Sequence, residues 1–238
     1  MTATALFRVS TEVFEQFPTY IVACVAARGT DPASKSEHFD ELLATARLRA
    51  RATFDGLDLK EQPPFAAWRD AFSAAGWSAS RYPASVEAIH KRIQRDDDLP
   101  RINTPVDLAN SAVLYYAVPV GTHDIQSFGG QPLVVRHASP DDTFVSMNGD
   151  EETADAGEIV YAAGSDIRTR RWVWRQGRAG LVADTARDIF FPLDGFTDRT
   201  YDAVVGAQNY LAEVCASELN ADVTTAVVAA DSPEFFID

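Results

Sequence analysis

The spacing of hydrophobic residues changes character at the segment Pro119–Gly121. Before this segment, apolar residues recur at three- and four-residue steps, which is typical of amphipathic helices. After it, they gather in short β-rich runs separated by Gly, Asn or Pro. The predicted helices cover residues 34–54, 63–76, 85–96 and 104–116, and the predicted strands cover 133–136, 143–147, 159–162, 168–174 and 188–191. This order predicts an α+β fold with a mainly antiparallel sheet flanked by helices.

The two ends of the chain are expected to join the same fold. Val9 and residues 20–26 read as β, residues 199–219 as a closing helix, and residues 224–229 as a strand that returns to the sheet. No internal repeat, low-complexity tract or linker interrupts the sequence. All 238 residues are therefore expected to form one domain.

The formal charge of −14 limits the partners that such a chain can take. A negative field repels polyphosphate, which counts against a general nucleic-acid binder and against DNA as a partner. Local basic segments remain, however, at residues 47–51 and 168–178. No apolar run of roughly 18 residues and no signal peptide is present, so a cytoplasmic protein without a membrane span is expected.

Few residues have the spacing of a metal or cofactor site. Cys24 and Cys215 lie far apart and are expected to be buried thiols. The four histidines show no ligand-like pairing, and no phosphate-binding or dinucleotide-binding glycine motif occurs. We therefore expect neither a metal nor a cofactor.

The pair His123-Asp124 follows a predicted helix and a loop that contains Pro119 and Gly121. Loops that leave a helix often carry catalytic side chains. The alternative is a surface histidine beside a turn-forming aspartate.

The helix that begins near Thr104, its expected N-cap, places Asp107 and Asn110 on one side of its first turns. Asp107 has a structural explanation at this position, because a carboxylate is favoured at any helix N-terminus.

Basic and aromatic residues alternate between residues 170 and 176. In a strand, Trp172 and Trp174 share one face, and Arg171 and Arg175 share the other. Such a strand either packs its tryptophans in a core and leaves the arginines at an edge, or binds phosphate oxygens or a tRNA backbone.

Five short segments occur in a fixed order along the chain: Ser85–Ala88, Leu99–Asn103, Val106–Asn110, Val118–Asp124 and Arg171–Gln176. Together they resemble the freestanding relatives of the B3/B4 domain, the editing module of the phenylalanyl-tRNA synthetase β subunit. The resemblance covers about residues 68–188. It implies an α+β fold that hydrolyses the ester between a wrong amino acid and the 3′ end of tRNA, performed in trans by freestanding members.

The resemblance carries over to the site only in part. Asp107 and Asn110 match the Asp-x-x-Asn helix of the family, and Asp124 matches the aspartate that closes its His-x-x-Asp loop. The loop histidine, however, aligns with Gly121, while His123 stands two residues later. The pocket glutamate of the synthetase domain is also lost near Arg175. These differences imply a substrate other than the tyrosine that the synthetase domain removes.

The resemblance suggests roles for individual residues. His123 or Asp124 would orient water or the terminal ribose, and Asn110 would hydrogen-bond the substrate. The expected substrate-binding residues are Glu87, Asp107 and Gly121. The expected tRNA-binding residues are Arg168, Arg170, Arg171 and Arg175.

The acidic composition and the carboxylates near the motifs suggest a cationic amino acid, such as canavanine attached to arginine tRNA. Glu87 would bind it if it faces the pocket; otherwise Glu87 is an exposed helix residue.

The expected function is thus trans-editing hydrolysis of a mischarged aminoacyl-tRNA by a monomer. Two alternatives remain. A non-catalytic module that binds tRNA or protein would keep the fold after losing the family's histidine. A small-molecule esterase or amidase would use the same pocket without tRNA, and this reading fits the charge of −14 better.

Overall fold

Strand β2 (Tyr20–Arg28) lies at the centre of the fold and is buried along almost its whole length. The computed structural model describes residues 5–31, 37–97 and 99–237. Side chains of β2 alternate between two hydrophobic clusters, with Tyr20, Val22, Cys24 and Ala26 in one and Ile21, Ala23, Val25 and Ala27 in the other. Burial on both faces explains why this segment is an unbroken apolar run.

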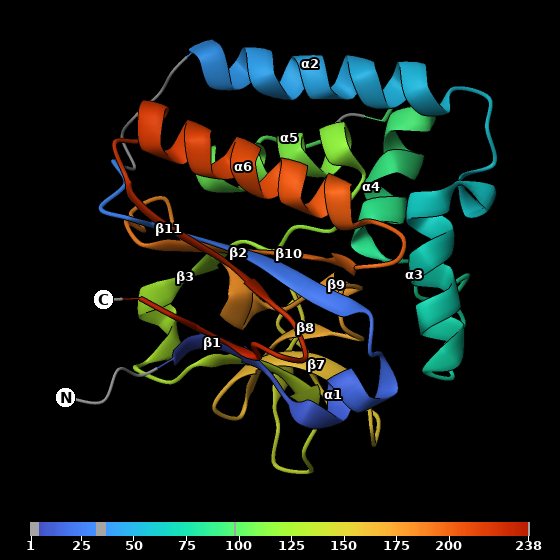
Figure 1. Ribbon diagram of the computed structural model, residues 1–238, viewed down its shortest axis with the longest axis vertical. Helices are drawn as coiled ribbons and strands as arrows, with labels where there is room; N and C mark the ends of the chain where they lie inside the picture. The colour runs from blue at the N-terminus through green and yellow to red at the C-terminus, as the bar shows by residue number, and fades with distance from the viewer. Residues whose placement is uncertain (1–4, 32–36, 98, 238) are drawn as a thin grey trace.

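The four-stranded sheet around β2 has the order β11-β2-β10-β3, and every pair in it is antiparallel. Its other strands are β3 (His123–Asp124), β10 (Ile189–Phe196) and β11 (Asp222–Val228). Helix α6 (Tyr201–Glu218) packs on this sheet, α5 (Thr104–Tyr116) packs on α6, and α2 (Glu37–Phe54) packs on α5 (Figure 1). The helices thus cover one face of the four-stranded sheet, and the second hydrophobic cluster lies between that face and the helices.

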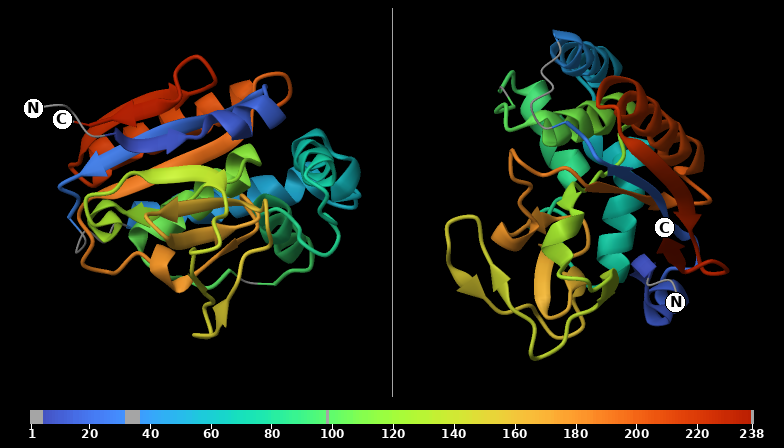
Figure 2. Two further views of the ribbon diagram at one scale, coloured as in Figure 1. Left: turned by 90° about the horizontal axis from the view of Figure 1, so that it is seen from below. Right: turned by 90° about the vertical axis from the view of Figure 1, so that its left-hand side faces the viewer.

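A six-stranded sheet faces the other side of β2 and has the order β12-β1-β4-β7-β8-β9. Its strands are β1 (Ala5–Val9), β4 (Leu133–His137), β7 (Ile159–Ala163), β8 (Asp166–Arg170), β9 (Arg175–Gln176) and β12 (Glu234–Phe236). Only the β1–β4 pair within it is parallel. Strands β5 (Phe144–Val145) and β6 (Glu151–Glu152) form a separate hairpin, drawn in yellow in Figure 2. The predicted α+β class is confirmed, but the strands form two sheets and a hairpin instead of one sheet.

The remaining helices flank the two sheets. They are α1 (Thr11–Gln16), α3 (Pro63–Ala74) and α4 (Ser85–Gln94), with short 3-10 turns η1 (Leu59–Glu61), η2 (Ile125–Phe128) and η3 (Arg178–Gly180). The helices predicted from periodicity are confirmed; the proposed start of the first one, at residues 34–36, lies outside the described residues. The N-cap of α5 is Asn103, whose side chain accepts a hydrogen bond from the Val106 amide, and not Thr104.

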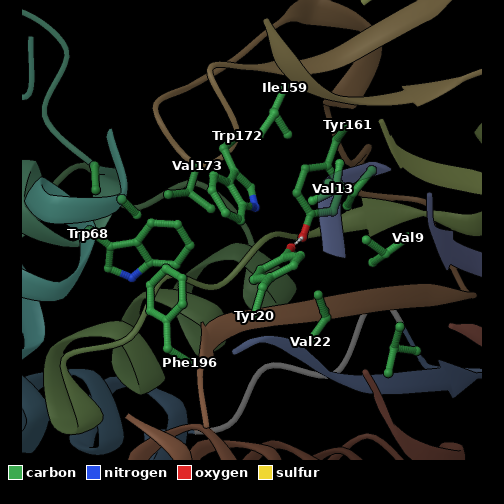
Figure 3. Close-up of a cluster of buried hydrophobic side chains, with 14 of the residues drawn as sticks. Val9, Val13, Tyr20, Val22, Trp68, Ile159, Tyr161, Trp172, Val173 and Phe196 are labelled. Carbon is green, nitrogen blue, oxygen red and sulfur yellow. Dashed lines mark hydrogen bonds between the residues drawn. The ribbon is translucent and has the colours of Figure 1, made fainter. Parts of the chain in front are cut away.

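Aromatic side chains fill the space between the two sheets (Figure 3). The ring of Trp172 lies 4.6 Å from that of Tyr20, 5.2 Å from Trp68 and 4.7 Å from Phe17, measured between centroids. These contacts join β2, α3 and the segment between β8 and β9 into one core.

Trp172 comes from a turn, so the prediction of a continuous strand over residues 168–174 is wrong. Arg171 and Trp172 have left-handed φ angles of 44° and 63°. This conformation costs a non-glycine residue about 1–2 kcal/mol. The fully buried indole removes about 150–250 Å² from water, which stabilises the fold by roughly 4–6 kcal/mol. Burial of the ring therefore outweighs the backbone strain.

The two cysteines are buried free thiols, as predicted. Burial raises the pKa of Cys24 and raises that of Cys215 to about 12. None of the helices in the described ranges has the length and apolarity needed to cross a membrane.

Candidate active site between the two sheets

A cavity of about 80 Å³ lies where the two sheets meet. Its walls come from the loop Pro119–Gly121, β3 and β10 on one side, and from β7, β8, β9 and the Trp172–Trp174 turn on the other. One water molecule needs about 10–15 Å³ by this measure. The cavity therefore has room for several water molecules or a small organic group.

Asp194 supplies a buried carboxyl to this cavity. It lies on the same face of β10 as Phe190 and Phe196, which belong to the core between the sheets, and so its side chain faces the six-stranded sheet. The hydroxyls of Tyr20 and Tyr161 each donate to its Oδ1 atom over 2.5 Å. The two hydroxyls themselves lie 3.3 Å apart (Figure 3). No donor to Oδ2 is found among the described residues.

The surroundings of Asp194 change the proton affinity of all three groups. Burial raises the pKa of Asp194 from 3.8 to about 7, although the hydrogen bonds from Tyr161 and Tyr20 oppose the rise. Burial and the nearby carboxylate also raise the pKa of both tyrosines well above 10. The tyrosines thus remain hydrogen-bond donors while the carboxyl titrates near neutral pH.

His123 on β3 lines the same cavity and is 2% exposed. Its ring stacks on that of Tyr161, with centroids 6.1 Å apart and an interplanar angle of 15°. Burial and the positive charge of Arg168 lower the pKa of His123 to about 3. The imidazole is therefore neutral at physiological pH, with one nitrogen that donates and one that accepts. Its Nδ1 atom is buried without a hydrogen-bond partner in the part of the chain that is described.

Gly121 leaves the space that the His123 ring occupies. A Cβ atom at this position would lie 3.0 Å from Nε2 of His123 and 2.9 Å from Cγ of Pro192. The Gly121 amide donates to the Pro192 carbonyl over 2.8 Å, which holds the loop against β10. The imidazole of His123 consequently lies beside the point where a side chain at residue 121 would begin.

The opposite wall is aromatic and basic. The guanidinium of Arg175 lies over the Trp174 ring, 4.5 Å from its centroid, and pairs with Glu152. Gln176 donates through its side-chain amide to the carbonyls of Gly180 and Thr122. This wall combines a flat apolar surface with fixed polar groups, as in typical small-ligand pockets.

Three of the residues predicted for the site line the cavity, namely His123, Gly121 and Arg175. Asn110 and Asp124 do not. Asp124 caps η2, because its side chain accepts a hydrogen bond from the Gln126 amide over 3.0 Å. The functional roles suggested for Asn110 and Asp124 stay predictions.

The carboxylates of Asp107 and Glu87 are engaged elsewhere and do not line this cavity, so their suggested role in substrate binding stays a prediction. Asp107 accepts hydrogen bonds from Arg101 and from the Ile102 amide, in line with its structural reading at the N-terminus of α5. Glu87 is buried and pairs with Arg69 and Lys91. It is neither exposed nor part of the cavity wall.

Arg168, Arg170 and Arg171, which were expected to bind tRNA, are buried in the structure, and their suggested role in tRNA binding stays a prediction. All three are at most 5% exposed. Arg170 makes two hydrogen bonds to Glu158 and one to Glu152, and Arg171 pairs with Asp155. Arg168 donates to carbonyl groups of Ser127 and Ala179. These guanidinium groups are held inside by their partners and do not face an external phosphate.

Sequence reasoning missed Asp194, Tyr20 and Tyr161 as members of the site. The predicted strand ended at residue 191 because Pro192 follows, and proline is usual at strand ends or edges. In the structure β10 continues through Pro192, and the loop Pro119–Gly121 covers its edge. The sequence did contain one signal for this site, because Asp194 lies in an apolar run two residues after Pro192. Within the described residues, no three His, Cys, Asp or Glu side chains are grouped to hold a metal ion.

These features define an α+β protein with a cavity between two sheets that contains a buried carboxyl group. A sequence model of the B3/4 domain matches residues 67–212, more than half of the chain, so the chain belongs to the B3/4 domain family. Among solved structures, the N-terminal fragment of the phenylalanyl-tRNA synthetase β-subunit from Pyrococcus horikoshii is similar, with a TM-score of 0.47 and 9% identity. The match covers 95% of this chain and 55% of that fragment, so the chain spans about half of its length. No curated protein compared with the chain matches it.

Proposed function

We propose that this B3/4 protein hydrolyses the ester between an amino acid and the 3′ end of tRNA, and that the reaction takes place in the cavity between the sheets. The observation that carries the proposal is the unused hydrogen-bonding capacity of a buried group at the cavity, Nδ1 of His123. It lies at the same cavity as the Asp194 carboxyl, whose Oδ2 atom receives no hydrogen bond from the described residues. An unsatisfied buried polar group costs about 1–3 kcal/mol, so such groups usually have a water or ligand as their partner.

Ester hydrolysis suits this set of groups. An aminoacyl ester is already activated, so it needs a positioned water and donors for the developing negative charge, but no covalent nucleophile. The neutral imidazole of His123 supplies one N–H donor to the substrate. The ring of Trp174, which is only partly buried, provides a flat surface for the apolar parts of the terminal nucleotide or the amino acid.

The identity of the amino acid is a separate matter. The carboxylates that suggested an arginine-like substrate, Glu87, Asp107 and Asp124, do not line the cavity. Canavanine on arginine tRNA is therefore one member of a panel to be tested and not part of the proposal.

The test is to incubate the protein with a panel of mischarged tRNAs and to measure the release of free amino acid. At least one ester should be cleaved, and H123A should slow its cleavage at least about tenfold, equivalent to about 1.4 kcal/mol in the barrier. H137A is the matched control, because His137 on β4 lies outside the cavity wall. Release from none of the tRNAs would sink the proposal.

A small-molecule esterase is the second candidate. It is favoured by the internal pairing of Arg170 and Arg171 and by the net charge of −14. Cleavage of free amino acid esters at a rate insensitive to added tRNA and to salt would select it, since tRNA binding is strongly salt-dependent. Binding of charged tRNA without turnover would instead indicate a non-catalytic module.

A further inference from the structure

Asp194 supplies the one carboxyl among the described residues that line the cavity. We propose that Asp194 accepts the proton of the attacking water, and that Tyr20 and Tyr161 are positioning residues that orient its carboxyl group. This inference rests on the proposed function and names the base at that site.

The hydrogen bonds around Asp194 give its two oxygen atoms different roles. Both tyrosine hydroxyls donate to Oδ1, which fixes the carboxyl plane and leaves Oδ2 without a donor in the described structure. The tyrosines come from opposite sheets, Tyr20 from β2 and Tyr161 from β7, so the carboxyl is held from both sides. A water in the cavity that donates to Oδ2 would satisfy the remaining acceptor and be oriented for attack.

The electrostatics of the cavity favour Asp194 over His123 as the base. A general base is most effective when its pKa lies near the working pH. The pKa of Asp194 is raised to about 7, whereas that of His123 is lowered to about 3. The titratable or charged groups that pack around Asp194 or share its cavity are Tyr20, Tyr161, Cys24, His123 and Arg175.

The reaction balances without a further reactant. The water oxygen forms a bond to the ester carbonyl carbon while one water proton passes to Oδ2 of Asp194. The carbon–oxygen bond to the ribose then breaks, and the proton held by Asp194 passes to the ribose oxygen that leaves. The products are the free amino acid and tRNA with an intact terminal hydroxyl, and the Asp194 carboxylate is restored.

The test is the pH dependence of kcat/KM on the ester that the wild-type protein cleaves, corrected for spontaneous hydrolysis. Wild type should rise with pH and level off above a midpoint near 7, as the carboxyl ionises. D194N should lower the plateau by about 100-fold or more, the usual contribution of general-base catalysis.

Y161F tests the positioning role with a milder change. The Tyr161 hydrogen bond lowers the pKa of Asp194, so its loss should move the midpoint upward by about 0.5–1 pH unit. The matched control is Y210F, because Tyr210 on α6 also makes one side-chain hydrogen bond, a partly buried one to Ser111, but lies outside the cavity wall. Y210F should leave the midpoint in place.

The outcomes separate the two proposals. If wild type cleaves an ester and D194N retains its rate, or Y161F leaves the midpoint unchanged while folding normally, the assignment of Asp194 is overturned and the proposed function stands. If wild type cleaves no ester, both fall.

Discussion

The buried carboxyl of Asp194 predicts an unusual pH dependence of stability. Its pKa is raised by burial from 3.8 to about 7 in the folded protein, so the folded state binds a proton more tightly than the unfolded state. Its stabilising effect is complete below about pH 4 and is lost as the pH rises through 7. A shift of about three pH units, at about 1.4 kcal/mol each, amounts to about 4 kcal/mol.

D194N isolates this contribution, because the amide has nearly the shape of a protonated carboxyl and does not titrate. The free energy of unfolding should be measured for wild type and D194N by urea denaturation at several values between pH 4 and pH 8. The difference, D194N minus wild type, should rise by about 4 kcal/mol over this range, since other groups cancel. D231N, which removes an exposed carboxyl, reports the effect of losing one surface charge. A difference that stays constant within about 1 kcal/mol across the range would refute the reasoning.

Two further changes test the packing around the cavity. E158Q breaks the buried ion pair with Arg170 and should lower the free energy of unfolding by about 3–5 kcal/mol, measured by urea denaturation; a loss below about 1 kcal/mol would contradict the internal role of that arginine. G121A places a Cβ 2.9 Å from Pro192 and 3.0 Å from His123. It should lower the free energy of unfolding by about 1–3 kcal/mol and slow ester cleavage. A variant as stable and as active as wild type would show that the loop moves to accept the added methyl group without cost.

Local signals were enough to predict α2 to α6, but not the short helix α1. The three- and four-residue spacing of apolar side chains gave α3 and α5 to within two residues at each end. The cap of α5 was placed one residue late, because Asn103 and Thr104 are both good caps and proline follows them. Which of the two side chains reaches the free amides depends on the backbone before the helix, which periodicity does not describe.

The turn after β8 could not be predicted from the same kind of signal. Basic and aromatic residues alternate from Arg170 to Arg175, and strict alternation is the pattern of a strand. The left-handed conformation of Trp172 is stabilised by contacts with Tyr20 and Trp68, which lie far away in sequence. Tertiary packing therefore overrides the local pattern at the point where the turn forms the cavity wall.

The candidate base, Asp194, could not be predicted from the sequence for a similar reason. Asp194 is separated from Tyr20 by 174 positions and from Tyr161 by 33, so the cluster exists only after the two sheets pack together. A lone aspartate in an apolar strand indicates a buried carboxyl, but its partners decide whether that carboxyl is ionised, protonated or balanced between the two.

The arginines show how composition changes the meaning of a motif. A run of arginines in a strand can bind phosphate. The sequence alone, however, does not show which carboxylates pair with these arginines. In a chain with 35 acidic and 21 basic residues, however, a guanidinium has many carboxylates of its own chain within reach. Arg170 pairs with Glu158, and Arg171 pairs with Asp155. These ion pairs fix the β8–β9 turn, which places Trp172 in the core. The arginines thus support the cavity wall from behind, and a loss of activity on their replacement should be accompanied by a loss of stability.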